Sequence, residues 1–313
     1  MTARLLRRLS RRVGIRLLET VPVLWLVVSI VFLLIHLVPG DPIQQMLGEG
    51  APPADVTALR HAYGLDLPLW QQYLHYWRGV LHLDFGMSLR LNRPVLSLLL
   101  ERYPYTLVLT LAALAVGILL AVPAGVTSAR RRGKWQDQTL GFVSLLGVSF
   151  PIFASAPLAI LFFSIYLGWL PVSGADGPLN LILPALTMGI ALAAILTRMV
   201  RTALLEELGH DYIRTARAKG VSETAVIYRH AMRNAMVPLL TIVGLQFGVL
   251  LAGAIITETI FSWPGVGRLT ISAISSRDYA LAQGCILAAG LTYVLVNLFT
   301  DVLYVVVNPR IRA

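Results

Sequence analysis

The chain has too few charged residues to cover the surface of a soluble globular protein. Only 13% of its 313 residues are charged and 57% are hydrophobic, and its mean hydropathy is +0.72. Soluble domains carry about 25% charged residues, most of them on the surface. The composition therefore indicates a protein that lies largely within a lipid bilayer.

Residue types that carry chemistry are also scarce. The single cysteine, Cys285, excludes a disulfide framework or a cysteine-based metal cluster within one chain, and we expect it to serve packing. The two lysines, Lys134 and Lys219, do not follow the glycine-rich loop of a nucleotide-binding site. The six histidines include no His-Glu-x-x-His pair, and no serine lies in a Gly-x-Ser-x-Gly elbow. The sequence therefore predicts no catalytic residue, cofactor site or metal site in this chain.

What the chain does contain is a set of long apolar runs. A helix needs about 20 apolar residues to cross a hydrocarbon core, and six runs approach or exceed that length. The third run is too long for a straight span, and Pro151 and Pro157 predict a kink or break within it. We expect an all-α integral membrane protein with about six transmembrane helices, over Leu17–Val38, Tyr105–Thr127, Thr139–Leu170, Leu181–Val200, Met236–Ile256 and Leu281–Val307.

The basic residues indicate how these spans are oriented. Lysines and arginines of short loops stay on the cytoplasmic side of a membrane. With six crossings, 19 of the 26 lysines and arginines fall on one side of the membrane, which predicts that both termini are cytoplasmic. The first run ends without a small-residue cleavage site, so we interpret it as a retained helix and not as a signal peptide. Because the basic residues are spread over loops, the net charge of +10 does not indicate nucleic-acid binding.

Two long connections interrupt the spans within what we treat as one domain, residues 1–313. The outer connection, residues 39–104, contains two expected helices, Ala54–Tyr63 and Leu69–Leu81. The second helix carries an apolar stripe that suits either the membrane interface or packing on the ends of the spans. The stripe consists of Trp70, Tyr73, Leu74, Trp77 and Leu81.

The cytoplasmic connection, residues 201–235, is more polar than the runs that flank it. Asp211 is a plausible N-cap of a short helix, and Gly220 is placed to end that helix in the left-handed conformation. Ser222 can cap a second helix that carries Val226, Ile227 and His230 on one side. The sequence predicts a helix, a glycine turn and a helix outside the membrane.

Polar residues within the spans are candidates for a solute pathway, although helix–helix hydrogen bonds explain them equally well. Glu258 follows the fifth span at its outer end, and Asp301 lies in the last third of the sixth, where we favour a partner arginine over a proton relay. The remaining pathway candidates are Thr187, Thr197, Thr241, Gln246 and Thr257.

The cytoplasmic loop resembles that of the permease subunits of ATP-binding-cassette importers, in particular the peptide/nickel family of dipeptide, oligopeptide, glutathione and nickel permeases. Asp211–Gly220 and Arg229–Pro238 carry this resemblance. Ala216 and Gly220 match the general coupling motif Glu-Ala-Ala-x-x-x-Gly, whereas Arg214 and Thr215 depart from it as is usual in this family. Further family segments occur in order at Pro39–Pro42, Gly64–Asp66, Pro68–Tyr73, Asp84–Gly86, Gly168–Pro171, Phe261–Arg268 and Asn308–Arg312.

This resemblance implies a type I importer permease in a prokaryotic inner membrane. Its partners would be a second homologous permease, two ATPase subunits that bind ATP and magnesium, an extracytoplasmic solute-binding protein and membrane lipid. The solute would be a peptide, glutathione, nickel or a metallophore complex, and the short loop Pro171–Asn180 leans towards glutathione or nickel. An ion-coupled secondary transporter and a membrane scaffold are the alternatives.

Within the resembling loop, a helical projection indicates which residues transmit the action of the ATPase. Ile213, Ala216 and Gly220 share one nearly bare side of the expected helix, and Arg217 flanks them. We expect this side, together with Asp211, to lie in a groove of the partner ATPase.

Overall fold

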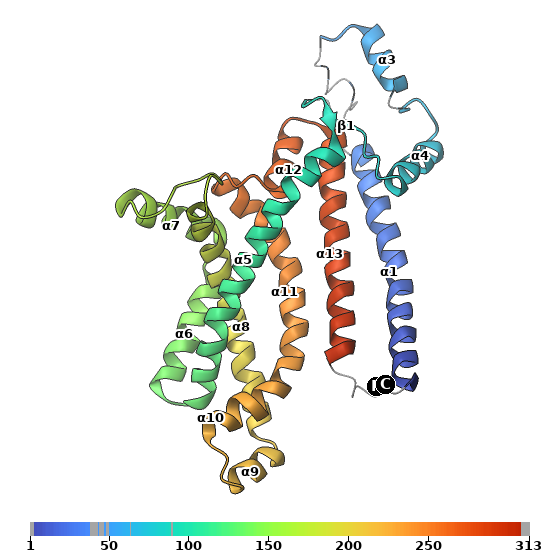
Figure 1. The fold of residues 1–313 in the computed structure, drawn as a ribbon. Helices are drawn as coiled ribbons and strands as arrows, with labels where there is room; N and C mark the ends of the chain where they lie inside the picture. The colour runs from blue at the N-terminus through green and yellow to red at the C-terminus, as the bar shows by residue number, and fades with distance from the viewer. Residues whose placement is uncertain are drawn as a thin grey trace.

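The computed structural model describes residues 3–37, 43, 47, 50–62, 64–88 and 90–307, and long helices dominate it (Figure 1). The long helices are α1 (Ala3–Leu37), α5 (Val95–Arg130), α6 (Trp135–Ser149), α8 (Leu179–Leu208), α11 (Met232–Ile260) and α13 (Tyr279–Val307). The short helices are α3 (Pro53–Ala62), α4 (Leu69–Leu81), α7 (Ile152–Ala159), α9 (Asp211–Ala218), α10 (Glu223–Ala225) and α12 (Val266–Ser275). Two π-helical segments, η1 (Ile160–Tyr166) and η2 (Val226–Ala231), follow α7 and α10 directly.

Three helices, α5, α8 and α13, are each long and apolar enough to cross a membrane. Two bent helix pairs pass the same test, so the described residues contain between three and five spans of this kind. The apolar part of α1, Leu18–Leu33, is shorter and corresponds to the first predicted run. The predicted all-α membrane class is confirmed.

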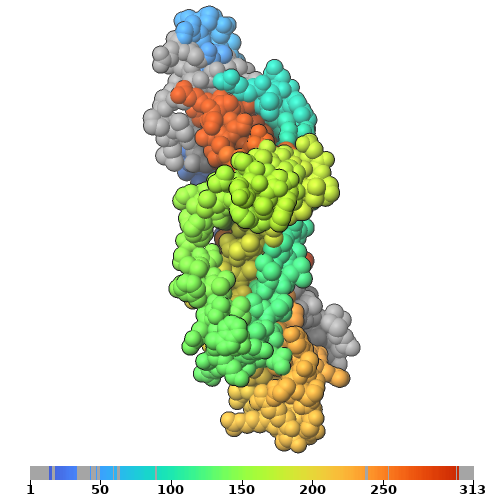
Figure 2. All heavy atoms as spheres, turned by 90° about the vertical axis from the view of Figure 1, so that its left-hand side faces the viewer, coloured from blue at the N-terminus to red at the C-terminus, as the bar shows by residue number. Residues whose placement is uncertain are grey.

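The third predicted run is broken. Helix α6 ends at Ser149, α7 begins at Ile152, and the two segments are bent by 100° relative to each other. Pro151 is the N-cap of α7, where proline's missing N–H costs no hydrogen bond. The second half of the run therefore turns aside from α6, and it projects as the yellow-green segment of Figure 2.

The two ends of the bundle differ in what they carry (Figure 1). One end, which we call the α9 end, holds the start of α1, the turn between α5 and α6, helices α9 and α10 and the end of α13. The other, the α12 end, holds α3, α4, α12 and a small hairpin. The basic segments Arg130–Lys134 and Arg198–Arg233, the second of which includes the end of α8, thus share one end with the first and last described helical turns.

The centre of the bundle is the pair formed by α5 and α8. A Cβ atom added to Gly125 would lie 2.6 Å from Val200, and one added to Gly189 would lie 2.6 Å from Val116. Small residues at such crossings let two membrane helices approach closely. Cys285 lies elsewhere, fully buried among apolar residues of α5, α12 and α13, and so serves packing as predicted.

The outer connection contains both predicted helices and one element that the sequence did not indicate. Helices α3 and α4 agree with the predicted ranges, α4 residue for residue. Strands β1 (Met87–Ser88) and β2 (Arg93–Pro94) form an antiparallel hairpin, with Met87 opposite Pro94. Buried Asp278 fixes this hairpin, because it accepts a hydrogen bond from Ser88 Oγ at 2.5 Å and also caps α13 through the Leu281 N–H.

The aromatic stripe of α4 is divided between two environments. Tyr73 packs on Phe32 of α1 with ring centroids 5.3 Å apart, and Trp77 lies partly buried against a cluster that includes Val28 of α1. Trp70, Leu74 and Leu81 remain exposed. The packing interpretation of the stripe is therefore correct for one side of α4, while contact with the membrane interface stays a prediction for the other.

Candidate functional site

The loop between α8 and α11 folds as a compact unit at the α9 end, and it forms the golden lower lobe in Figure 2. Gly220 follows α9 with φ +77°, the left-handed conformation predicted for it. The Ser222 hydroxyl accepts a hydrogen bond from the Ala225 N–H at 3.4 Å, which confirms the predicted cap of the second helix. Asp211 is the first residue of α9 and not its N-cap, a position held by the extended backbone of His210.

The side of α9 that we expected to contact the ATPase faces the bundle instead. Ile213 is fully buried, and Ala216 packs on the same cluster. This cluster joins α5, α8 and η2 through Val126, Ala129, Val200, Leu204, Val226 and Ile227. Burying these apolar groups holds α9 on the bundle, and the sequence alone could not show that this partner surface exists.

The opposite side of α9 is open. Asp211, Arg214, Thr215 and Ala218 are all exposed there, and an ion pair of 3.4 Å joins Arg214 to Asp211. The α9 surface available to another protein in this structure is therefore polar with one small residue, Ala218, near its centre.

The edges of α9 are tied to its neighbours by polar contacts. Arg217 donates from Nε to Glu223 at 2.6 Å, and this guanidinium holds the pKa of the Glu223 carboxyl below its ordinary value. The Tyr212 hydroxyl donates to Glu207 of α8 at 2.5 Å and accepts from Asn234 of α11 at 3.1 Å. A movement of α9 would consequently be transmitted to both α8 and α11 through the hydrogen bonds of Tyr212.

A second polar centre joins three long helices near the same end. Asp137 of α6 accepts two hydrogen bonds from Arg201 of α8, at 2.7 and 2.8 Å. It also accepts from Ser128 of α5 at 2.5 Å and from the Gly133 N–H at 2.9 Å. The carboxylate is buried and each of its oxygens has two donors, so this cluster fixes the ends of α5, α6 and α8 relative to one another.

A third polar centre, at the α12 end, involves Glu258. Its carboxylate is fully buried and accepts from Thr106 Oγ1 at 2.6 Å and from the Arg268 N–H at 2.9 Å. Thr106 Oγ1 in turn accepts from the Val266 N–H, so side chains of α5 and α11 together cap the start of α12. Glu258, predicted as a pathway residue, faces no open space in this structure and stabilises a helix terminus.

The other predicted pathway residues also lie mostly inside the bundle. Thr187, Thr197 and Thr257 are buried, and Thr187 donates to backbone carbonyls of its own helix. Thr241 and Gln246 are partly exposed. The Asp301 side chain lies outside the described residues. A pathway role for these residues stays a prediction, and none of them lines the cavity described next.

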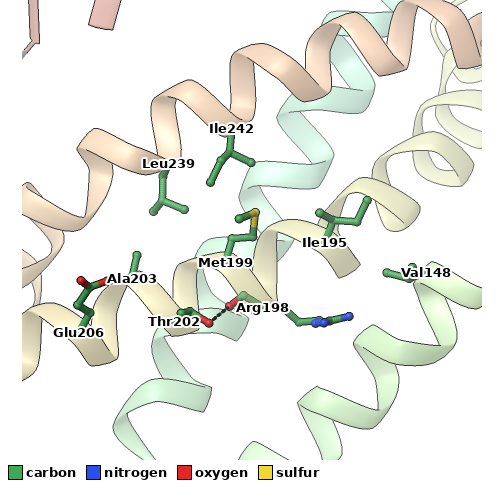
Figure 3. A pocket seen from close by; sticks show the side chains of 9 residues that line it. All are labelled: Val148, Ile195, Arg198, Met199, Thr202, Ala203, Glu206, Leu239 and Ile242. Carbon is green, nitrogen blue, oxygen red and sulfur yellow. Dashed lines mark hydrogen bonds between the residues drawn. The ribbon is translucent and has the colours of Figure 1, made fainter.

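A cavity of about 480 Å³ opens between α6, α8 and α11. Figure 3 shows α8 along its floor, with Val148 of α6 on one side and Leu239 and Ile242 of α11 on the other. Its charged groups, Arg198 and Glu206, both belong to α8 and lie on either side of Thr202.

Comparison with known protein families agrees with this architecture. Residues 121–313 match the family described as binding-protein-dependent transport system inner membrane component, and residues 5–110 match the N-terminal model of the same kind of component. The first match covers more than half of the chain. The chain belongs to this family. This inner membrane component is accordingly a transport protein of the inner membrane, as predicted.

Curated relatives of the inner membrane component are similar along nearly their whole length. The chain is 43% identical over 297 residues to the glutathione transport system permease protein GsiC of Escherichia coli strain K12, covering 95% of this chain and 97% of the relative. The GsiC protein of Shigella dysenteriae serotype 1 gives the same figures.

Solved structures show the same fold. An inward-facing MetNI methionine ABC transporter matches with a TM-score of 0.59 at 19% identity, covering 67% of this chain and 96% of that one. An amino acid ABC transporter crystallised with histidines matches with a TM-score of 0.51 at 17% identity, covering 69% and 94%. The type I permease fold is thereby confirmed.

Sequence reasoning missed Asp137 and Thr106, which belong to two of the polar centres of this inner membrane component. Asp137 offered a signal, because a carboxylate two residues before an apolar run is poorly placed unless a cation or helix terminus compensates it. Thr106 offered none, since a threonine at the start of an apolar run has no unusual property. Both depend on partners far away in the sequence.

Proposed function

We propose that this chain is one of two transmembrane permease subunits of an ATP-driven importer for short peptide-like solutes, with glutathione as the first candidate. The observation that carries the proposal is the 43% identity to a glutathione transport system permease over 95% of the chain. The chain itself would bind no nucleotide and would have no enzymatic activity. Its solute would arrive from an extracytoplasmic solute-binding protein.

The lobe formed by α9, α10 and η2 supports this division of labour. It stands beyond the ends of α5 and α6 and exposes one polar side of α9 (Figure 1). It is also fastened to α8 and α11 through Tyr212. Such a lobe suits contact with an ATPase subunit in the aqueous phase at the α9 end. The similarity to a MetNI ABC transporter also favours ATPase partners.

Reconstitution tests the proposal directly. The chain, its second permease and the two ATPase subunits would be placed in liposomes with the solute-binding protein outside and ATP inside. We expect ATP-dependent uptake of reduced glutathione that disappears when the binding protein is omitted. Uptake driven by a proton or sodium gradient without ATP would instead establish the ion-coupled alternative.

The proposed orientation places the α9 end in the cytoplasm. Both Asp176, between η1 and α8, and Glu223, in the α9 lobe, are exposed and can carry a thiol in a Cys285→Ala background. We expect Asp176→Cys to react in intact cells with a membrane-impermeant maleimide and Glu223→Cys to react only after the membrane is opened. The reverse pattern would invert the topology.

The exposed side of α9 should be the surface that contacts the ATPase. Ala218 lies near the centre of this side, so Ala218→Trp places a bulky ring between the two proteins without entering the apolar cluster beneath Ile213. We expect the variant to accumulate normally but to lose at least about tenfold of binding-protein-stimulated ATP hydrolysis and uptake, since a loss of only about 1.4 kcal/mol of binding free energy weakens an interface tenfold.

Ala218→Ser is the matched control, because it keeps a small side chain at the same position. Normal stimulation of the Trp variant would exclude this surface of α9 as the docking site. The change Ala216→Leu is less informative, since Ala216 packs on the bundle and a larger side chain there would disturb the loop itself.

The coupling residues predicted from the sequence then divide into two roles. Asp211 and Arg217 lie at the surface and could touch the ATPase, whereas Ile213 and Ala216 connect α9 to the bundle. Gly220 permits the turn that follows. The exposed residues Trp70 and Leu74 of α4 offer an apolar surface with one aromatic side chain for the solute-binding protein at the α12 end.

A further inference from the structure

The cavity between α6, α8 and α11 contains an arginine, Arg198, that forms no ion pair within the part of the chain that the structure describes. Arg198 is exposed to the cavity, and among the residues that the structure describes no carboxylate lies within ion-pair distance of its guanidinium. Glu206, the carboxylate of the same cavity, is two helical turns away, or about 12 Å along the axis at about 1.5 Å per residue. The donors of the guanidinium are therefore available to another group.

The position of Arg198 makes this charge unusual. The residue lies within the fourth predicted span, Leu181–Val200, on a helix apolar enough to cross the membrane. Arg198 is only two residues from the end of that run, and a cation on an apolar helix normally faces a protein partner or a water-filled cavity unless it extends to the nearby headgroups. The cavity that Arg198 lines provides such a setting on this side of α8.

The direction of the side chain also argues against a role at the lipid headgroups. An arginine near a span end usually extends towards the nearer membrane surface. Figure 3 shows the Arg198 side chain extending the other way, along α8 towards Val148 and away from Glu206. The neighbouring Gly147 packs on Ala194, one turn of α8 further from the α9 end than Arg198. The guanidinium thus points away from the α9 end and towards the middle of the predicted span.

The lining of the cavity suits a solute that is only partly polar. Ile195, Met199, Leu239 and Ile242 supply apolar walls around the cation. The Thr202 hydroxyl donates its hydrogen bond to the backbone carbonyl of Arg198. Arg198 and Glu206 are the charged residues of the lining, and they are the groups that can distinguish anionic from cationic solutes. A guanidinium binds a carboxylate with two parallel hydrogen bonds, which gives orientation as well as affinity.

We propose that the α6–α8–α11 cavity is a section of the solute pathway and that Arg198 binds a carboxylate of the passing peptide-like solute there. This inference rests on the proposed function. It specifies in addition that the solute carries a negatively charged group and that Arg198 binds this group. A short peptide or glutathione has such a carboxylate at its C-terminus. Arg198 would thus favour anionic or zwitterionic solutes over cationic ones.

The first experiment needs no knowledge of the solute. A single thiol is introduced by Thr202→Cys in a Cys285→Ala background, and the complete importer is purified in nanodiscs. Its reaction rates with the anionic reagent MTSES and the cationic reagent MTSET are compared. We expect both to react, and we expect Arg198→Gln to lower the MTSES-to-MTSET rate ratio at least fivefold.

Two controls make this result specific. Arg132→Gln removes an exposed arginine from the turn between α5 and α6 and should leave the ratio unchanged. Leu119→Cys, on an exposed part of α5, should react poorly if that surface faces lipid. A Thr202→Cys thiol that does not react would show that lipid or another subunit fills the cavity, and an unchanged ratio would show that Arg198 does not attract anions; either result overturns the proposal.

The second experiment measures transport of reduced glutathione in liposomes. Arg198→Gln should lower uptake at least tenfold while binding-protein-stimulated ATP hydrolysis stays within twofold, and Arg198→Lys should recover much of the uptake because it retains the charge. Equal loss in the Lys and Gln variants would assign Arg198 to packing and reject the proposal. If the unmodified importer does not transport glutathione, the choice of solute fails while the thiol experiment still decides the role of Arg198.

Discussion

Gly267→Ala is expected to prevent the chain from accumulating as a stable permease, although it adds only one methyl group. That methyl group would lie 2.6 Å from the Cα atom of Ile255 and 2.9 Å from Glu258 Oε2. The first neighbour is backbone and the second is a fully buried carboxylate held by Thr106, so neither can move aside cheaply. Overpacking of this kind costs about 1–3 kcal/mol and occasionally more, and here it also separates α12 from its cap.

The matched control is Gly141→Ala. Gly141 lies within α6, and a Cβ atom added there would meet nothing within 4 Å. Alanine should stabilise that helix by up to about 1 kcal/mol, because glycine is the poorer helix former. The amount of monodisperse protein in detergent extracts, followed against temperature, compares the two variants. Equal profiles would mean that the start of α12 is not closely packed against α11.

Asp137→Ala should have the second largest effect, by releasing the ends of three helices at once. The change leaves the Arg201 guanidinium, the Ser128 hydroxyl and the Gly133 N–H without their shared acceptor. Breaking a buried ion pair by removing one partner costs about 3–5 kcal/mol, and the lower end applies here because Arg201 is one-third exposed. We expect lower thermal stability and, in the assembled importer, ATP hydrolysis that no longer produces uptake.

Asp176→Ala serves as the control for this prediction. It removes an exposed carboxylate beyond the far end of α8 and should change stability by less than about 0.5 kcal/mol. Asp137→Asn separates charge from shape, since the amide keeps one acceptor but presents an N–H₂ group to the guanidinium. If Asp137→Ala unfolds at the same temperature as the unmodified protein, the cluster does not hold the three helices together.

Features that depend on neighbouring residues could be predicted from the sequence. The range of α4, the left-handed Gly220 and the cap at Ser222 all follow from residues within a few positions of one another. The break at Pro151 was predictable for the same reason. Its angle was not, because the direction of α7 depends on packing against α8 and α11.

Features that depend on distant residues could not be predicted. The orientation of α9 is the clearest case, since a helical projection shows that Ile213 and Ala216 share a side but not what covers it. Glu258 and its partner Thr106 are 152 residues apart, and the pathway role assigned to Glu258 reflected only its position at a span end. A buried carboxylate and a pathway carboxylate look alike in sequence, because both interrupt an apolar run.

The pairing of α1 with α13 has a consequence for biogenesis. Helix α1 packs chiefly against α13, and the β1–β2 hairpin is fastened by Asp278 at the start of that same helix, 190 residues from Ser88. At roughly 5–20 residues per second, a ribosome needs on the order of tens of seconds to proceed from α1 to α13. During this interval the first helix resides in the bilayer without its partner. A nascent chain arrested before α13 should therefore expose α1 and the hairpin to membrane quality-control proteases. The packing of the α12 end is completed only when α13, the last helix, has been inserted.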